Sequence, residues 1–277
     1  MDALQLVLLG SPRYVSLAYH AIDPRWRDPS LSVEPRVFAD QMQRLAKRGY
    51  RGLTFSAAVL DDNPGRIVAI TFDDAYPSVA EHALPVLREL GWPATVFVPT
   101  ATAASGGLMT WLSPDFAAEK RQLSWPELTD LAEAGWEIGS HSRTHRLLST
   151  LDEAELQEEL EGSRAEIVAH LGSCTSIGYP WGEVDNRVVE GARRAGYTVG
   201  SGFAKRFVHD DPLRSPRVPI AGLDGRVRFA LKTSGLLWTL RSTPLWDALE
   251  TARGLDSDRD KAPKGLTARL QSLLRLR

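Results

Sequence analysis

The chain has 277 residues and a formal net charge of −2, with 43% hydrophobic and 25% charged residues. This composition is typical of a soluble globular protein with enough apolar material for a sizeable core. The balanced charge gives no general electrostatic reason to expect a nucleic acid as a partner. A single cysteine, Cys174, excludes a fold held together by internal disulfides.

The two ends of the chain bear on where the protein acts. The first residues, MDALQLVLLGSPRYVSL, lack a basic segment and have only a short apolar run, so we expect no signal peptide and a cytoplasmic protein. No stretch approaches the roughly 20 apolar residues of a membrane span. The end of the chain, LTARLQSLLRLR, predicts a basic helix with leucines on one face. This helix could pack on the domain, form a solvated tail or contact a membrane surface peripherally.

Short runs rich in Val, Ile and Thr alternate with helix-like segments along most of the chain. Apolar side chains at helical spacing and capping signals, such as Ser124 with Glu127, predict the helices. Residues 101–124 are expected to form a long loop or a small insertion. The expected strands are 15–20, 66–74, 94–100, 136–141, 175–180, 197–202 and 214–220, and the expected helices are 35–50, 77–91 with a kink or start at Pro85, 124–135, 150–172 and 185–196.

This alternation predicts an α/β fold. Strands joined through helices imply right-handed crossovers and a parallel sheet, and about seven such repeats favour a distorted (β/α)7-type barrel over an open sheet. The pattern ends near residue 225, which predicts a barrel over residues 1–225 and a C-terminal helical extension over 226–277. Catalytic residues of such barrels lie at the carboxyl ends of the strands. Polar residues follow the expected strands at His20, Asp73, Asp74, His141 and the Tyr179–Pro180–Trp181 segment.

Two groups at these strand ends indicate a metal site. The adjacent carboxylates Asp73 and Asp74 would repel each other at the mouth of a buried strand, and a divalent cation removes that cost. His141 and His145 can present their imidazoles to one point when the turn between them is helical. One carboxylate with two imidazoles is a common zinc set that leaves a position for water, and the other aspartate would be free to act as a base. Taken alone, each pair more often has a structural role.

Three stretches of the chain share a specific order and spacing with a known family. They are TFDDAYPSVAEHALPVLRELGWPATVFV, LSWPELTDLAEAGWEIGSHSRTH and GYPWG. They resemble consecutive blocks of the polysaccharide deacetylase family, also called the NodB homology domain or carbohydrate esterase family 4. The resemblance implies a distorted barrel with one divalent metal ion, which we expect to be Zn²⁺, with Co²⁺, Ni²⁺ or Fe²⁺ as alternatives. It also implies hydrolysis of the acetamide of N-acetylglucosamine units in chitin, peptidoglycan or exopolysaccharide.

The resemblance assigns roles to individual residues. Asp73 matches the general base, and Asp74, His141 and His145 match the three metal ligands. The backbone N–H of Trp181 would hold the oxyanion together with the metal.

Three neighbouring positions are candidates for substrate contact. Tyr179 and Pro180 belong to the same YPWG segment as Trp181. Trp111, in the 101–124 segment, could stack on a sugar ring.

The chain departs from the family at three positions. Gly178 stands where the third block usually begins with an arginine that orients the base, and we hypothesise that Arg217 supplies this guanidinium. No histidine after residue 210 matches the family's usual acid. The SLAYH segment resembles the early strand of a permuted sub-group, so His20 is the predicted general acid, with a structural histidine as the alternative reading. Ala75 replaces the glycine common after TFDD.

The leading function is therefore removal of N-acetyl groups from the amino sugars of a glycan or glycan precursor. Two other functions stay open. The same barrel could act on a small non-carbohydrate amide, such as a cyclic imide or ureide. A catalytically silent member of the family could bind a glycan or a partner. The two aspartates and two histidines predicted for catalysis and metal binding are all present, which argues against this reading.

Overall fold

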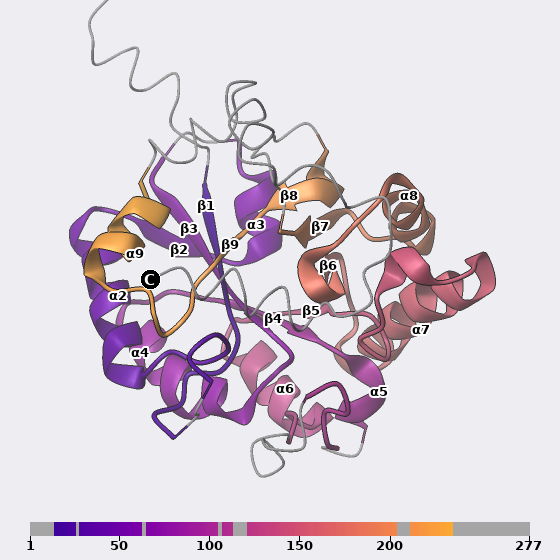
Figure 1. Ribbon diagram of the computed structural model, residues 1–277, viewed down its shortest axis with the longest axis horizontal. Helices are drawn as coiled ribbons and strands as arrows, with labels where there is room; N and C mark the ends of the chain where they lie inside the picture. Colours follow the sequence, from indigo (N-terminus) through magenta and orange to yellow (C-terminus); the bar gives the residue numbers. More distant parts are fainter. Residues whose placement is uncertain are drawn as a thin grey trace, which may run out of the picture.

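The computed structural model describes residues 14–25, 28–62, 65–104, 107–112, 121–203 and 211–234. The strands form one parallel sheet in the order β8-β7-β6-β5-β4-β3-β1-β9, with β2 paired to β3. Helices surround this sheet (Figure 1). The strands are β1 (Val15–Tyr19), β2 (Arg51–Leu53), β3 (Ile67–Asp73), β4 (Thr95–Val98), β5 (Glu137–Ser140), β6 (Ser176–Gly178), β7 (Val199–Gly202), β8 (Ser215–Pro216) and β9 (Val218–Pro219).

A single interrupted strand nearly closes the barrel. Only Arg217 separates β8 from β9, and β8 pairs with β7 while β9 pairs with β1. Pro216 and Pro219 lack the N–H groups that a continuous ladder would use, which accounts for the short pairings. The expected strand 214–220 is thus present in two pieces, and the predicted distorted barrel is confirmed.

Sequence reasoning missed strand β2. Its three residues pair with Ile67–Ala69 at the start of β3, while β4 pairs with Thr71–Asp73 at the end of the same strand. Three residues are too few to show the two-residue alternation that identifies a strand. The long β3 therefore contacts two strands in tandem on one side, which distorts the barrel.

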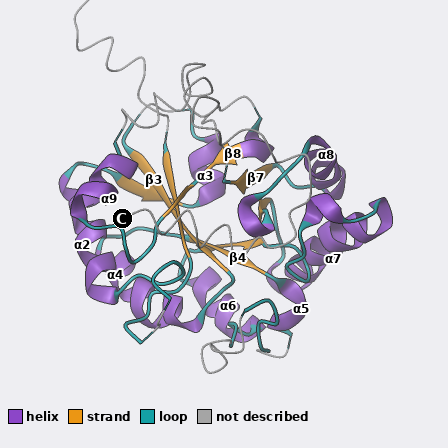
Figure 2. Cartoon of the chain, in the orientation of Figure 1, coloured by secondary structure: helices purple, strands orange, loops and turns teal. Residues whose placement is uncertain are grey.

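The helices lie outside the sheet (Figure 2). The expected helix 77–91 consists of a π-helical turn followed by an α-helix, because Pro85 has no N–H to donate to the carbonyl four residues earlier. The helices are α2 (Pro35–Lys47), α3 (Phe55–Leu60), η1 (Val79–Ala83), α4 (Leu84–Glu89), α5 (Thr100–Ala103), α6 (Trp125–Glu133), η3 (Leu148–Thr150), α7 (Glu153–Leu171), η4 (Pro180–Gly182), α8 (Asn186–Ala195), η5 (Pro212–Arg214) and α9 (Arg226–Lys232).

Helix α9 begins the predicted C-terminal extension. Its Phe229 is buried, and Arg48 at the end of α2 donates to the hydroxyl and carbonyl of Thr233 at 2.8 and 3.1 Å. This part of the extension therefore packs on the barrel. Residues 235–277, with the predicted leucine-rich helix, lie outside the described residues. Among the helices that are described, none has the length and apolarity needed to cross a membrane.

Strand register brings the predicted site residues to one end of the barrel. All seven residues of β3 are buried. Tyr19 of β1 pairs with Phe72 of β3, so His20 lies level with Asp73. Ser140 of β5 pairs with Ile177 of β6, which places His141 beside Gly178. The carboxyl ends of these strands therefore meet around one site.

Candidate metal centre

The three predicted metal ligands lie within reach of one ion. Asp74 follows β3, His141 and His145 follow β5, and one ligand atom of each lies within 4.8 Å of the others. Nε2 of His145 is 3.2 Å, and Nε2 of His141 is 3.9 Å, from Oδ1 of Asp74. Tetrahedral zinc, with ligand bonds of about 2.0–2.2 Å, separates its ligand atoms by roughly 3.4 Å. The spacing of the triad therefore fits a single divalent ion.

One hydrogen bond leaves the correct nitrogen of His141 free for a metal. Nδ1 of this ring lies 2.6 Å from the carbonyl oxygen of Gly178. Because a carbonyl oxygen only accepts, Nδ1 carries the proton and Nε2 keeps its lone pair, on the side of Asp74. Metal-ligating histidines almost always donate their other N–H in this way.

Burial governs the ionisation of the triad. It raises the pKa of the Asp74 carboxyl to about 8, helped by the negative charge of Asp73 and opposed by the side chains of Tyr76 and Trp111. It lowers the pKa of His141 to about 4 and the pKa of His145 well below its usual value. The imidazoles are thus neutral, as metal binding requires. Oδ1 of Asp74 is buried and has no hydrogen-bond donor among the described residues, so a cation is the partner that this carboxylate fits.

A buried arginine holds the predicted base, Asp73. Nη1 and Nη2 of Arg217 donate to the two carboxylate oxygens at 2.6 and 3.1 Å, and Nη1 also donates to the hydroxyl of Thr71 at 2.9 Å. Burial, the largest single influence, raises the pKa of the Asp73 carboxyl, but the charge and hydrogen bond of Arg217 and the charges of His141 and His20 together outweigh it and lower the pKa to about 2. Asp73 is therefore ionised at neutral pH and fixed in orientation.

The guanidinium of Arg217 occupies space that Gly178 leaves open. A β-carbon at Gly178 would lie 2.8 Å from Cγ of Phe97 and 3.3 Å from Nη2 of Arg217. The guanidinium also lies over the Phe97 ring, 4.9 Å from its centre. The position that carries an arginine in the resembling family therefore has no room for one here.

Backbone strain is concentrated in the loops of this site. Among the described residues other than glycine, those with positive φ have values between 56° and 67°. This conformation costs an L-residue roughly 1–2 kcal/mol and is enriched at functional sites. It explains why glycine is common where this chain has Ala75. The strained residues are Asp74, Ala75, Ser142, His145 and Trp181.

The loop between the two histidines is not helical, although a helical turn is the conformation for which the sequence predicts converging imidazoles. Residues 141–147 form no helical turn, and Arg143 and Thr144 form a bend. Positive φ angles of 61° at Ser142 and 62° at His145 turn the backbone instead. The imidazoles of His141 and His145 consequently meet with 4.9 Å between ring centres and an angle of 63° between ring planes.

His20, the predicted acid, lies beside the Asp73–Arg217 pair. Burial lowers the pKa of this imidazole, while the negative charge of Asp73 raises it and the positive charge of Arg217 lowers it. The register of β1 and the influence of these charges place His20 at the same end of the barrel as the triad. Its role as an acid stays a prediction.

Two tryptophans flank the imidazole of His145. Trp111 stacks on it, with 4.4 Å between ring centres and 16° between planes. Trp181 lies 5.1 Å away on a tilted plane and donates from Nε1 to the carbonyl oxygen of His145 at 3.3 Å. One face of Trp111 is therefore occupied by a predicted metal ligand. Trp181 is 40% exposed and offers the more accessible ring.

Tyr179 and Pro180 are the two predicted substrate contacts that precede Trp181 in the YPWG segment. Both residues are buried. The Tyr179 hydroxyl donates to the carbonyl oxygen of Leu213 at 3.0 Å. Both residues belong to the turn that carries Trp181, and their contact with substrate stays a prediction.

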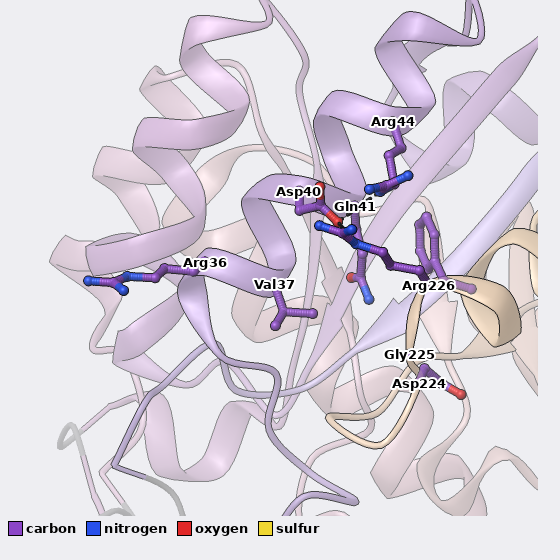
Figure 3. Close-up of a pocket in the computed structure, with 9 residues that line it drawn as sticks. Arg36, Val37, Asp40, Gln41, Arg44, Asp224, Gly225 and Arg226 are labelled. Carbon is purple, nitrogen blue, oxygen red and sulfur yellow. Dashed lines mark hydrogen bonds and ion pairs between the residues drawn. The ribbon is translucent and has the colours of Figure 1, made fainter.

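Sequence reasoning missed Tyr76 as a residue of the site. Its side chain is buried, and it lowers the pKa of Asp74. Its place two residues after Asp74 in the TFDDAY segment is the only signal that points to it. A separate pocket of about 270 Å³ lies between α2 and α9 (Figure 3), and none of the predicted site residues lines it.

Comparison with known sequences identifies relatives. The profile of the polysaccharide deacetylase family matches residues 61–200. YxkH of Bacillus subtilis, named as a polysaccharide deacetylase, is 29% identical over 191 residues, covering 66% of this chain and 62% of that protein. The chain thus matches less than two thirds of this relative. Poly-beta-1,6-N-acetyl-D-glucosamine N-deacetylase of Staphylococcus aureus is 26% identical over 209 residues, covering 69% of this chain and 68% of the relative.

Solved structures share the fold. The Streptococcus pyogenes deacetylase PplD in complex with acetate has a TM-score of 0.69 at 20% identity, covering 81% of this chain and 99% of that one. IcaB from Ammonifex degensii has a TM-score of 0.64 at 23% identity, covering 82% and 96%. The family profile spans just over half of the chain, and the barrel carries its motifs to one end. The chain belongs to the polysaccharide deacetylase family.

Proposed function

We propose that the chain is a metal-dependent hydrolase that removes N-acetyl groups from the amino sugars of a glycan. The observation that carries this proposal is the buried Asp74, His141 and His145 triad next to the Asp73–Arg217 pair. Membership of the polysaccharide deacetylase family supports it. The similarity to a staphylococcal enzyme named for poly-β-1,6-N-acetylglucosamine supports a polymer of N-acetylated amino sugars as the substrate.

We propose Zn²⁺ as the ion that the triad holds. One carboxylate and two neutral imidazoles are ligands that zinc favours, and three protein ligands leave a position open for catalysis. When bound, such an ion polarises a carbonyl group and lowers the pKa of water. Cobalt, nickel and iron suit the same ligand set, so metal replacement is the way to distinguish them.

Asp73 acts as the base in this proposal. It takes a proton from the attacking water while Arg217 holds both carboxylate oxygens in place. Because the pKa of Asp73 is low, the carboxylate is ionised before the reaction and releases the acquired proton readily. A positioned general base of this type contributes typically about 10²–10⁴-fold to the rate.

The remaining roles fall to His20 and Trp181. His20, on the side of β1 next to Asp73, passes to the departing amine the proton that Asp73 takes from the attacking water, so that both side chains return to their starting states. The backbone N–H of Trp181, held in the strained YPWG turn with φ of 63°, donates to the oxyanion. One preorganised donor of this kind is worth about 3–4 kcal/mol of barrier.

Acetate release from defined substrates tests the proposal. We expect the protein to release acetate from oligomers of N-acetylglucosamine, to lose this activity with a chelator and to regain it with Zn²⁺. Asp73→Asn should abolish turnover without loss of bound metal. Hydrolysis of a cyclic imide or ureide in place of every N-acetylated oligosaccharide would overturn the glycan proposal. Metal binding with no hydrolysis of either class would indicate a silent member.

A further inference from the structure

The loop that joins the two histidine ligands is held by one buried carboxylate on helix α7. Backbone N–H groups of Arg143 and Thr144 both donate to Oε2 of Glu159, each at 2.9 Å. The Thr144 hydroxyl donates to Oε1 of the same side chain. Glu159 is only 4% exposed. Three donors therefore converge on one carboxylate. They come from two residues that lie between the predicted ligands His141 and His145 in the chain.

The other backbone donors of this loop depend on short serine side chains. The N–H of Ser142 donates to the hydroxyl of Ser140, and the N–H of His145 donates to the hydroxyl of Ser142, both at 3.1 Å. Glu159 is thus the acceptor for both central N–H groups, and it comes from a separate element of the fold. Without it both N–H groups would lose their acceptor within the fold.

The loop needs this support because its backbone is strained. Ser142 and His145 both have positive φ, which an unsupported loop would relieve. A change in the backbone conformation of His145 would move its imidazole away from Asp74 and His141. The carboxylate of Glu159 does not touch these imidazoles, so it acts on them through the backbone.

We propose that Glu159 is a positioning residue that sets the geometry of the two histidine ligands and thereby the metal affinity of the site. This inference rests on the proposed metal site at Asp74, His141 and His145. Residues outside the ligand shell that orient metal ligands typically contribute 10–100-fold in affinity. The same range applies to Glu159.

Helix α7 supplies a matched control one residue away. The side chain of Glu158 is 68% exposed and forms an ion pair with the side chain of Arg143 in the same loop, at 3.0 Å. Replacement of Glu158 by alanine removes a carboxylate from the same helix and the same loop, but leaves the backbone N–H groups paired with Glu159. It therefore separates loss of charge near the loop from loss of the backbone acceptor.

The experiment measures Zn²⁺ affinity by competition with a chromogenic chelator at pH 7.5, with folding of each metal-free variant checked by circular dichroism. Glu159→Ala should weaken affinity about 10–100-fold. Glu158→Ala should bind as the wild type does. Glu159→Gln should recover most of the loss, because its amide oxygen can accept both N–H groups while its amide nitrogen donates to the Thr144 hydroxyl.

Several results would overturn the inference. One is wild-type affinity in folded Glu159→Ala, and another is an equal loss in Glu158→Ala. Glu159→Gln as weak as Glu159→Ala would also contradict it, since the backbone acceptor is then irrelevant. If Glu159→Ala does not fold, Glu159→Asp, whose shorter side chain cannot reach both N–H groups, takes its place with the same expected loss. Absence of Zn²⁺ binding in the wild type, or undiminished binding in His145→Ala, would instead refute the proposed function.

Discussion

Arg217 offers the sharpest test of how the site is built. Replacement of Arg217 by methionine keeps an apolar side chain against Phe97 but removes the guanidinium that pairs with Asp73. The Asp73 carboxylate then stays buried without its cation. Breaking a buried ion pair from one side typically costs about 3–5 kcal/mol. The bidentate geometry and the near-complete burial of both side chains place this pair within that range.

A double-mutant cycle isolates the pair. The free energy of unfolding should be measured in urea at pH 7 with a chelator present, for wild type, Arg217→Met, Asp73→Asn and the double variant. We expect the double variant to be more stable than Arg217→Met alone, because asparagine carries no charge that needs a cation. Arg217→Met should not lower the free energy of unfolding by less than about 1 kcal/mol, because that is the contribution of a solvent-exposed ion pair; so small a loss would refute the reasoning. So would strict additivity of the two single changes.

Three further outcomes follow from the same geometry. In chelated protein the unfolding temperature should fall as pH rises from 6.5 to 8. The pKa of Asp74 is raised from 3.8 to about 8, so its contribution to stability is lost with rising pH through that range, whereas the contribution of His141, whose pKa is lowered from 6.5 to about 4, is already complete above pH 6.5. Saturating Zn²⁺ should remove this fall, and a chelated protein that gains stability over the window would contradict the charge states. Gly178→Ala should cost about 1–3 kcal/mol in urea unfolding, because the added carbon meets Phe97 at 2.8 Å; unchanged stability would show that the ring moves freely. His20→Ala should lower kcat about 10²–10⁴-fold with unchanged Zn²⁺ affinity, and full turnover in this variant would leave His20 a structural role.

The barrel and the end of the barrel that carries the site could be predicted from the sequence. Strand–helix alternation predicted the parallel sheet, and the rule that polar residues gather at carboxyl ends of strands grouped Asp73, Asp74 and His141. These inferences rest on periodicity, which is local. They succeeded because most strands are buried along their whole length, as β3 is.

Features that depend on contacts between distant segments could not be predicted in the same way. The split of the last strand at Arg217 follows from pairing with β7 on one side and β1 on the other. The backbone of the loop that brings His141 and His145 together has positive φ angles at two residues. Its N–H groups donate to side chains of β5 and α7, and no rule of residue spacing predicts these hydrogen bonds. Tyr179 lies in a motif at a strand end, yet its side chain is buried and its hydroxyl donates to the carbonyl oxygen of Leu213. A motif therefore locates the turn without showing which of its side chains face the substrate.

A crystal structure of the zinc-loaded protein, with anomalous diffraction data at the zinc edge, tests the metal centre directly. The proposed metal centre predicts one strong anomalous peak per chain, about 2.0–2.2 Å from an Asp74 oxygen and from Nε2 of His141 and of His145, with the Asp73 carboxylate still on Arg217. A peak at other residues, or an ion ligated by Asp73 in place of Asp74, would contradict it.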